Sequence, residues 1–243
     1  MRKHRVRKGI LGRKPLETNT SHPGRSPQNS FNAKVIMKMM SLREGNVIVK
    51  TARSAVESHL SGKKFEPPLK TSAGLEKQLG VFVSLIDRLN GGGLRGCIGI
   101  PVATRPLLVQ VRVAAVEAAT MDSRFGPVKL DEFGRIVVEV TILSPLEEVA
   151  VEKPLELREK IVVGRDGLIV DGVGYRGLLL PQVAVEEGFD SEDFLSQCCL
   201  KAGLSPDAWL TGEVKVSRFQ GQVFAEERPN GRVFERILDQ GER

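Results

Sequence analysis

The chain has 243 residues, of which 41% are hydrophobic and 27% charged, a composition typical of a soluble globular protein with one large domain or two small ones. No apolar run approaches the roughly 18 residues that a membrane-spanning helix needs. We expect no secretory signal, because no apolar segment lies near the first residue. The three cysteines are too few for a disulfide scaffold and suit a reducing interior. We therefore expect a cytoplasmic protein.

The net charge of +6 is unevenly distributed along the chain. Residues 1–50 carry 12 Lys and Arg against 2 acids, whereas residues 51–243 carry 24 Lys and Arg against 28 acids. A nucleic-acid-binding domain concentrates its cations on the folded surface that meets the phosphates. The acidic body therefore argues against a nucleic-acid partner, apart from weak phosphate binding by the basic segment.

Residues 1–40 form a basic tail that is rich in Ser, Pro, Asn and Gly, a composition that predicts disorder. Three interpretations of this tail are open. It is an unstructured basic arm, an organelle-targeting leader, or an extension upstream of the true start of the protein. Met37, Met39 and Met40 favour the third interpretation, because all three precede the first segment with a folded pattern.

We expect the folded domain to span residues 41–228, with a possible division into two subdomains, and a charged C-terminal stretch to follow at 229–243. Apolar residues at helical spacing predict an amphipathic helix over 47–60. Two short β-branched segments flank a glycine-rich turn and predict a hairpin, with strands at 80–86 and 94–100.

The run 107–119 is apolar nearly all round, which predicts a central helix that Thr104 can cap. Further strands are expected at residues 135–144, 161–163, 168–170, 175–180 and 213–219. The first of these alternates like a half-exposed strand, and Asp166-Gly167 indicates a hairpin turn between the next two. A helix at 191–200 begins at Ser191, which can cap it. Paired strands with helices between the groups predict the α+β class, with an order of elements that roughly repeats.

The nine residues from Gly91 to Gly99 include five glycines, which let the backbone approach a neighbour closely. On a strand, Arg95 and Cys97 share one face because side chains alternate. A guanidinium beside a thiol stabilises the thiolate and lowers the pKa of the cysteine. Cys97 and Arg95 are therefore the candidate catalytic residues. Three roles for Cys97 are open: an inert packing residue, a binding-site residue and a nucleophile.

A catalytic cysteine usually needs a base, most often a histidine. His4 and His22 lie in the tail, and the position of His59 late in its helix is more typical of a half-buried residue than of a base. Cys198 lies on the apolar face of its helix, and Cys199 points about 100° away from it. No paired Cys or His spacing suits zinc, and we expect neither a metal nor a cofactor.

Two polar motifs are candidates for a binding pocket beside the glycine-rich strand. Asp122 and Arg124 carry opposite charges two residues apart in a loop, where they form either a loop-fastening ion pair or a polar corner of the pocket. Gln182 follows an apolar strand at a strand-to-helix turn and can present its amide inward. Together with Gly96 and Gly99, these three residues are the candidate binding residues.

The hexapeptide Leu94-Arg95-Gly96-Cys97-Ile98-Gly99 resembles the signature of the AMMECR1 family. Further motifs follow in the order found in that family, at residues 80–83, 122–127, 167–170, 177–184, 194–195, 201–204 and Trp209. The resemblance covers roughly residues 45–225. Two positions depart from the family pattern: Phe189 stands where Trp is usual, and Ile100 stands where Thr is common.

The resemblance implies an α+β fold in which two strand–helix repeats surround a mixed, barrel-like sheet, with a cleft near residues 94–99. It implies no settled activity. Some relatives are joined to or encoded beside Memo-like and radical-SAM proteins, which implies a shared modification pathway and these proteins as partners. Eukaryotic members resemble regulatory or adaptor proteins. Asn and Gln are scarce in the folded body, a pattern typical of a thermophilic source.

We therefore predict a regulatory or accessory binding domain that recognises a small molecule or a peptide in a cleft at Arg95 and Cys97. The alternative is an enzyme that uses Cys97 as an activated thiolate, in redox or modification chemistry. In that alternative Arg95 holds the thiolate, while Asp122, Arg124 or Gln182 orients the substrate.

Overall fold

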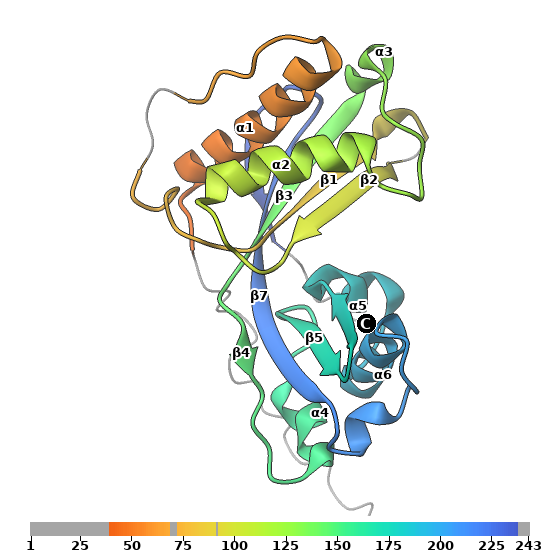
Figure 1. The fold of residues 1–243 in the computed structure, drawn as a ribbon. Coiled ribbons are helices and arrows are strands. Elements are labelled where there is room, and N and C mark those ends of the chain that lie inside the picture. Colours follow the sequence, from red (N-terminus) through yellow and green to blue (C-terminus); the bar gives the residue numbers. More distant parts are fainter. Residues whose placement is uncertain (1–38, 69–71, 91, 238–243) are drawn as a thin grey trace, which may run out of the picture. The chain divides into compact units, whose positions relative to one another are not determined.

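The computed structural model describes residues 39–68, 72–90 and 92–237. The predictions for the basic tail therefore fall almost entirely outside the described residues. Eight strands and six α-helices form the part of the chain that is described (Figure 1). The strands are β1 (Val81–Asp87), β2 (Gly93–Ile100), β3 (Ile136–Leu143), β4 (Glu147–Glu148), β5 (Asp166–Gly172), β6 (Tyr175–Leu179), β7 (Lys215–Glu226) and β8 (Val233–Arg236). The helices are α1 (Leu42–Leu60), α2 (Leu107–Thr120), α3 (Leu130–Phe133), α4 (Leu157–Lys160), α5 (Pro181–Glu187) and α6 (Ser191–Lys201).

The strand order repeats in two halves. In the first half, the hairpin β1–β2 leads into α2, and β3 then returns beside β1, which gives the order β2-β1-β3. In the second half, the hairpin β5–β6 leads into α5 and α6, and β7 then returns beside β5, which gives the order β6-β5-β7. The predicted α+β class and the predicted repeat are both confirmed.

The long strand β7 belongs to both halves (Figure 1). Its first residues pair with β4 and β5, and its last residues pair with β3 and β8. Every pairing among the described strands is antiparallel, so the expected mixed sheet is corrected to an antiparallel one. The reason is that each half begins with a hairpin, and its third strand returns antiparallel to the first.

Helices α1 and α2 cover one face of the first half. Helix α1 starts at a capping box, in which Ser41 Oγ accepts from Glu44 N and Glu44 Oε2 accepts from Ser41 N. Its buried face packs with α2 on the apolar residues of β1 and β3, which include Val83, Leu85 and Val140. Because small residues line α2, this helix lies close to the strands beneath it.

Helix α6 covers one face of the second half in the same way. Phe194, Leu195 and Cys198 of this helix pack on Leu168 and Val170 of β5, and all five are fully buried. The face of each half that lies opposite these helices is called its inner face below. The two inner faces meet at a small apolar cluster of Leu143, Ile169 and Phe219, with Phe82, Leu178 and Leu180 packed against it.

Several local predictions are wrong for reasons that lie in tertiary structure. Residues 161–162 are irregular and lead into a turn at 163–165 instead of forming a strand, because the Asp166 carboxylate accepts from Val162 N and from the Arg165 guanidinium. The hairpin turn lies instead between β5 and β6, where Gly174 has a φ of +77°. Strand β3 is buried along its whole length, not half-exposed, because it lies centrally between β1 and β7.

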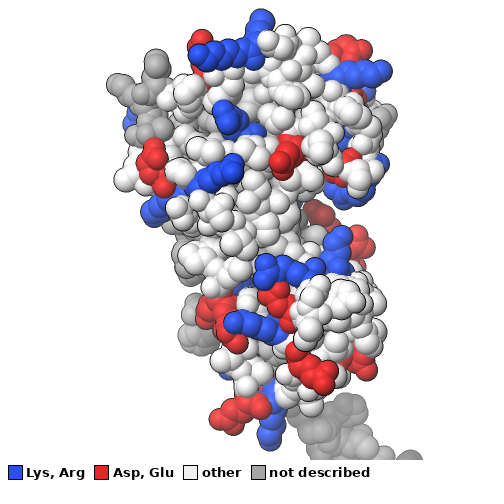
Figure 2. Space-filling view, in the orientation of Figure 1, with Lys and Arg blue, Asp and Glu red and all other residues white. Residues whose placement is uncertain are grey.

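Helix caps and strand ends differ from the predictions in smaller ways. Pro106 precedes α2 in place of a Thr104 cap, and Asp190, one residue before the predicted Ser191, accepts from Asp193 N at the start of α6. The predicted last strand continues to Glu226, and the charged C-terminal stretch contains β8. None of the helices in the described part of the chain is both long and apolar enough to cross a membrane. Basic and acidic side chains are interspersed on the face seen in Figure 2.

Candidate functional site

Arg95 is held by the loop that follows α2 and does not act on the thiol of Cys97. A β-bulge changes the register from Leu85↔Gly96 to Ile86↔Leu94 and leaves Arg95 without a partner on β1. Bulges re-aim a side chain in this way. The Arg95 guanidinium donates to Glu132 Oε1 at 2.8 Å and Oε2 at 3.2 Å.

The same guanidinium donates to two backbone carbonyls, the oxygens of Gly126 at 2.8 Å and Pro127 at 3.2 Å. Arg95 thus uses four of its five N–H donors on the loop from α2 to α3 and on Glu132 of α3. The Arg95 and Glu132 side chains are both mostly buried, and their ion pair therefore fastens this loop to the edge strand β2. The expectation that Arg95 stabilises a Cys97 thiolate is therefore wrong.

Cys97 is half-buried on β2, and its thiol accepts a hydrogen bond from Ser84 Oγ at 3.3 Å. Burial raises the pKa of the Cys97 thiol, while the Ser84 hydrogen bond and the Arg124 charge oppose this rise. The nearby carboxylates of Asp122 and Glu139 raise the pKa further. The sum is a thiol that ionises less readily than a free cysteine, which is the opposite of the predicted activation.

Asp122 joins Cys97 to Arg124. Its carboxylate accepts from Cys97 N at 2.8 Å, from Arg124 Nε at 3.0 Å and from Arg124 Nη2 at 2.8 Å. These bonds, first of all those from the Arg124 side chain, lower the pKa of Asp122 to about 2. The predicted ion pair is present, and it lies beside Cys97 as predicted. Asp122 is buried, whereas the Arg124 side chain stays 56% exposed, so a cation is accessible there.

Ser84 and Glu139 complete a row of polar side chains that the sequence analysis missed. The register pairs Ser84 with Cys97 on one side and with Glu139 on the other, so the three residues lie side by side across β2, β1 and β3. We call Cys97, Ser84 and Glu139 the polar row. A signal was present in the sequence, because Ser84 and Glu139 each interrupt an otherwise apolar strand pattern.

Glu139 is a buried acid, only 5% exposed, at the centre of the sheet. Burial raises the pKa of its carboxyl, the Arg236 charge opposes this rise, and the Glu186 charge adds to it. Arg236 Nε lies 3.4 Å from Glu139 Oε2, and Arg236 Nη2 lies 3.6 Å from Glu186 Oε1 on α5. Through Arg236, helix α5 is therefore linked to the polar row.

Gln182 lies in the first turn of α5, at the strand-to-helix turn that the sequence predicts. It is buried, and its Oε1 has no hydrogen-bond partner among the described residues. Pro181 beside it faces the inner face of the first half, since a Cβ built on Gly221 would lie 3.1 Å from Thr141 Cγ2 and 3.6 Å from Pro181 Cγ. A buried acceptor without a donor is unfavourable unless something else binds it.

Packing accounts for the two predicted glycines. A Cβ on Gly96 would lie 2.1 Å from the carbonyl oxygen of Ala118 in α2, and a Cβ on Gly99 would lie 2.1 Å from Cε1 of Phe82. Both positions need glycine because a neighbour fills the space of a side chain. Neither contact indicates a ligand.

The remaining candidate residues lie away from the polar row. His59 is exposed on α1, where a half-buried residue was expected, and α1 covers the face opposite Cys97. Cys198 is a core residue, as predicted, and burial raises its pKa to about 12. Cys199 is fully buried as well, although it points away from Cys198 on the helix. Among the described residues, no group of three or more His, Cys, Asp or Glu is placed to hold a metal ion.

The second half offers an internal control for the polar row. A Cβ on Gly177 of β6 would lie 2.2 Å from the carbonyl oxygen of Cys198 in α6. A Cβ on Gly96 of β2 would meet the carbonyl oxygen of Ala118 in α2 in the same way. These two close contacts align the second strands of the two hairpins. The residues that follow from this alignment and from the strand register are Leu178 for Cys97, Ile169 for Ser84 and Ser217 for Glu139.

Comparison with known proteins agrees with this architecture. A solved structure, the crystal structure of uncharacterized protein PH0010 from Pyrococcus horikoshii, matches with a TM-score of 0.78 and 45% identity over 82% of this chain and 100% of that chain. Protein MJ0810 of Methanocaldococcus jannaschii is 48% identical over 202 residues, which are 83% of this chain and all of the relative. Protein PF1979 of Pyrococcus furiosus is 50% identical over 194 residues, 78% of this chain and 91% of the relative.

The fold and the site define an α+β protein of two repeated halves, in which the first half has Cys97, Ser84 and Glu139 on its inner face where the second half has Leu178, Ile169 and Ser217. The model of the AMMECR1 family matches residues 49–224. The chain belongs to the AMMECR1 family, as its hexapeptide suggests, and these relatives come from thermophilic archaea.

Proposed function

We propose that this protein is a regulatory or accessory binding domain, and that the inner face at the polar row binds a small molecule or a peptide segment. One observation carries the proposal. At two of its three positions, Cys97 and Ser84, the polar row has polar side chains where the second half has Leu178 and Ile169 of an apolar cluster. The third position is polar in both halves, since Glu139 corresponds to Ser217. Buried polar groups lower the stability of a protein. Sites that have polar side chains where packing favours apolar ones are often functional.

The groups around the polar row support binding by hydrogen bonds and charge. The half-exposed Arg124 guanidinium offers donors to an acceptor or an anion. On α5, the helix that Arg236 links to the polar row, Gln182 Oε1 is a buried acceptor that needs a donor. A ligand with an N–H or O–H donor and an anionic or carbonyl acceptor matches both. Amides of a peptide segment and many small metabolites have this combination.

Catalysis by Cys97 has weaker support. A nucleophilic cysteine needs a lowered pKa or an adjacent base, whereas burial raises the pKa of Cys97 and Glu132 binds the Arg95 guanidinium. We therefore propose a bound ligand in preference to a substrate of the thiol. Memo-like and radical-SAM proteins stay the predicted protein partners, on the family resemblance.

The proposal is tested by ligand-observed NMR with a fragment library and a set of short peptides. Hits are accepted only if they shift the backbone amide of Cys97 or Ser84. The variant Cys97→Leu/Ser84→Ile gives the first half the side chains of the second half, and we expect it to fold and to lose these hits. The matched control Cys199→Ala changes a buried cysteine away from the row and should keep them. Hits that survive in Cys97→Leu/Ser84→Ile would place binding elsewhere.

The enzyme alternative is tested by the rate of carboxymethylation of Cys97 with iodoacetamide as a function of pH. Cys97→Ser protein supplies the background from the two buried cysteines. We expect slow modification with an apparent pKa above the free value of about 8.5. An apparent pKa well below this value would restore the thiolate enzyme as the better function.

A further inference from the structure

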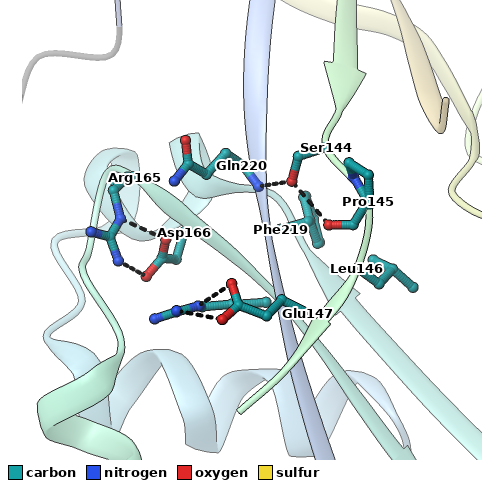
Figure 3. A pocket seen from close by; sticks show the side chains of 9 residues that line it. Ser144, Pro145, Leu146, Glu147, Arg165, Asp166, Phe219 and Gln220 are labelled. Carbon is teal, nitrogen blue, oxygen red and sulfur yellow. Dashed lines mark hydrogen bonds and ion pairs between the residues drawn. The ribbon is translucent and has the colours of Figure 1, made fainter. Parts of the chain in front are cut away.

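A pocket with charged walls lies where β3 ends, far along the chain from the hexapeptide. It has a volume of about 320 Å³. Its walls come from the segment before and within β4, the start of β5 and the middle of β7 (Figure 3). The lining residues are Ser144, Pro145, Leu146, Glu147, Arg165, Asp166, Arg218, Phe219 and Gln220.

Two guanidinium groups line this pocket. Arg165 donates from Nε and Nη2 to the two carboxylate oxygens of Asp166, both at 2.7 Å. Arg218 donates to Glu147 Oε1 at 2.9 Å and Oε2 at 3.2 Å, and to the carbonyl oxygen of Lys160 at 3.0 Å. A guanidinium has five N–H donors, so these bonds use two of the five in Arg165 and three of the five in Arg218.

The two carboxylates in the pocket differ in how firmly they are held. The Asp166 side chain is 1% exposed and also accepts from Val162 N at 2.9 Å, so it is a fixed part of the turn before β5. The Glu147 side chain is 65% exposed and pairs with Arg218 from the two-residue strand β4. Exposed ion pairs of this kind contribute little to stability. Glu147 can therefore leave Arg218 at small cost.

Glu147 shows where an external anion can bind. Its carboxylate is bound by Nε and Nη2 along one edge of the Arg218 guanidinium, a bidentate geometry that arginine uses for carboxylates and phosphates. The charges of Arg218 and Arg165 both lower the pKa of Glu147, which places this carboxylate within electrostatic reach of both guanidinium groups. Figure 3 draws both ion pairs on the walls of one hollow.

We propose that this pocket binds an organic oxyanion, a phosphate monoester or a carboxylate, which displaces Glu147 from Arg218 and is held by Arg218 and Arg165. The exposed Leu146 and the neighbouring Pro145 give one wall of the pocket an apolar surface for the body of the ligand. Glu147 then acts as a tethered competitor that occupies Arg218 until a ligand arrives. This site is independent of the polar row.

The test is a titration of the whole protein at constant ionic strength, followed through the backbone amides of Glu147 and Gln220 by NMR. The probes are inorganic phosphate, phenyl phosphate and benzoate. We expect the wild type to bind phenyl phosphate or benzoate at these amides, and the probe that binds tells which oxyanion the pocket prefers. No shift with any of the three probes in the wild type and in Glu147→Gln would overturn the proposal.

The variants identify the site. Glu147→Gln removes the competitor, and we expect about two- to fivefold tighter binding, the range of an exposed ion pair. Arg218→Gln removes the guanidinium and its paired N–H donors, and should weaken binding by about tenfold or more. The matched control is Glu148→Gln, which removes the same charge from the next residue of β4, where it pairs with Lys215. Equal affinities in Glu147→Gln and Glu148→Gln, or full binding by a folded Arg218→Gln protein, would show that the ion binds elsewhere.

Discussion

The first and second halves of the fold share one strand order, yet their inner faces carry different side chains. In the second half, Leu178 and Ile169 fill an apolar cluster. In the first half, the equivalent positions hold Cys97 and Ser84, beside the buried Glu139. The packing against the helices is the same in both, down to a glycine that meets a helix carbonyl. Residues that are repeated in both halves are those that the fold requires. Residues that differ between the halves are not required by the fold, and a function can depend on them.

The largest effect is expected where the halves agree. Gly96→Ala and Gly177→Ala each place a Cβ within 2.2 Å of a backbone oxygen of a packed helix. We expect each to lower the free energy of unfolding by about 3 kcal/mol, at the upper end for overpacking. Urea denaturation measures this loss, with Gly134→Ala, which meets nothing within 4 Å, as the control. A large loss in one half only would contradict the equivalence of the two glycines.

The next effect is expected where the halves differ. Ile169→Ser puts the residue of the first half into a fully buried position of the second half. Lost burial and an unpaired hydroxyl should cost about 2 to 3 kcal/mol. The reverse change, Ser84→Ile, should leave stability unchanged or raise it, because Ser84 is only half-buried. Thermal unfolding of both variants checks the opposite signs, and a loss of similar size in both would show that Ser84 is structural.

A smaller effect is expected at Asp122. Its pKa is about 2 in the folded protein, below the ordinary value of 3.8, because Arg124 and Cys97 N bind the carboxylate. A lowered pKa of an acid stabilises the fold above the ordinary value, and this contribution is lost as pH falls from about 4 towards 2. Because Arg124 is exposed to solvent, we expect Asp122→Asn to cost about 1 kcal/mol at pH 7.

The measurement is urea denaturation of wild type and Asp122→Asn at pH 7 and near pH 2. The difference in unfolding free energy should shrink at the lower pH, where the carboxylate of the wild type takes up a proton. Asp193→Asn, on the exposed surface of α6, is the control for the loss of one acid. A difference that stays the same at both pH values would mean that the Asp122 charge does not cause it.

The smallest effect is expected at Glu139. Burial raises the pKa of its carboxyl, so the charged form is disfavoured in the folded state, and stability falls as pH rises through the ordinary value of 4.5. Glu139→Gln removes this dependence while it keeps a polar side chain of the same size. The loss of a disfavoured buried charge and the loss of the ion pair with Arg236 oppose each other, so we expect the free energy of unfolding, measured by urea denaturation, to change by only about 0.5 kcal/mol at pH 7. A loss of several times this size would make the Glu139 ion pair with Arg236 a structural anchor.

Local patterns in the sequence predict much of this fold. The hairpin at β1–β2, the helices α2 and α6 and the α+β class follow from periodicity and turn residues, which act between neighbours in the chain. The direction of Arg95 does not follow, because a bulge depends on which residue of β1 each residue of β2 meets. The turn at 163–165 does not follow either, because the Asp166 side chain stabilises it through Val162 N and Arg165.

Only part of the candidate site could be predicted, because local patterns in the sequence do not determine strand register. Cys97, Asp122 and Arg124 lie together as predicted, since a short loop and an edge strand bring them close. Ser84 and Glu139 were missed because the register of three strands, and not their spacing in sequence, places them beside Cys97. The structural equivalence of Cys97 and Leu178 rests on the contacts that Gly96 and Gly177 make with the helices α2 and α6, which are tertiary contacts.

Strand β7 is shared by both halves of the sheet, so neither half has a complete set of hydrogen bonds without it. A fragment that ends before Lys215 would leave β3 and β5 each with an unpaired edge, and such edges favour aggregation. Loss of β7 from one half of the sheet would also destabilise the other half. We therefore expect the two halves to melt in one cooperative transition, in spite of their separate cores, and slow amide exchange to extend across both through this one strand.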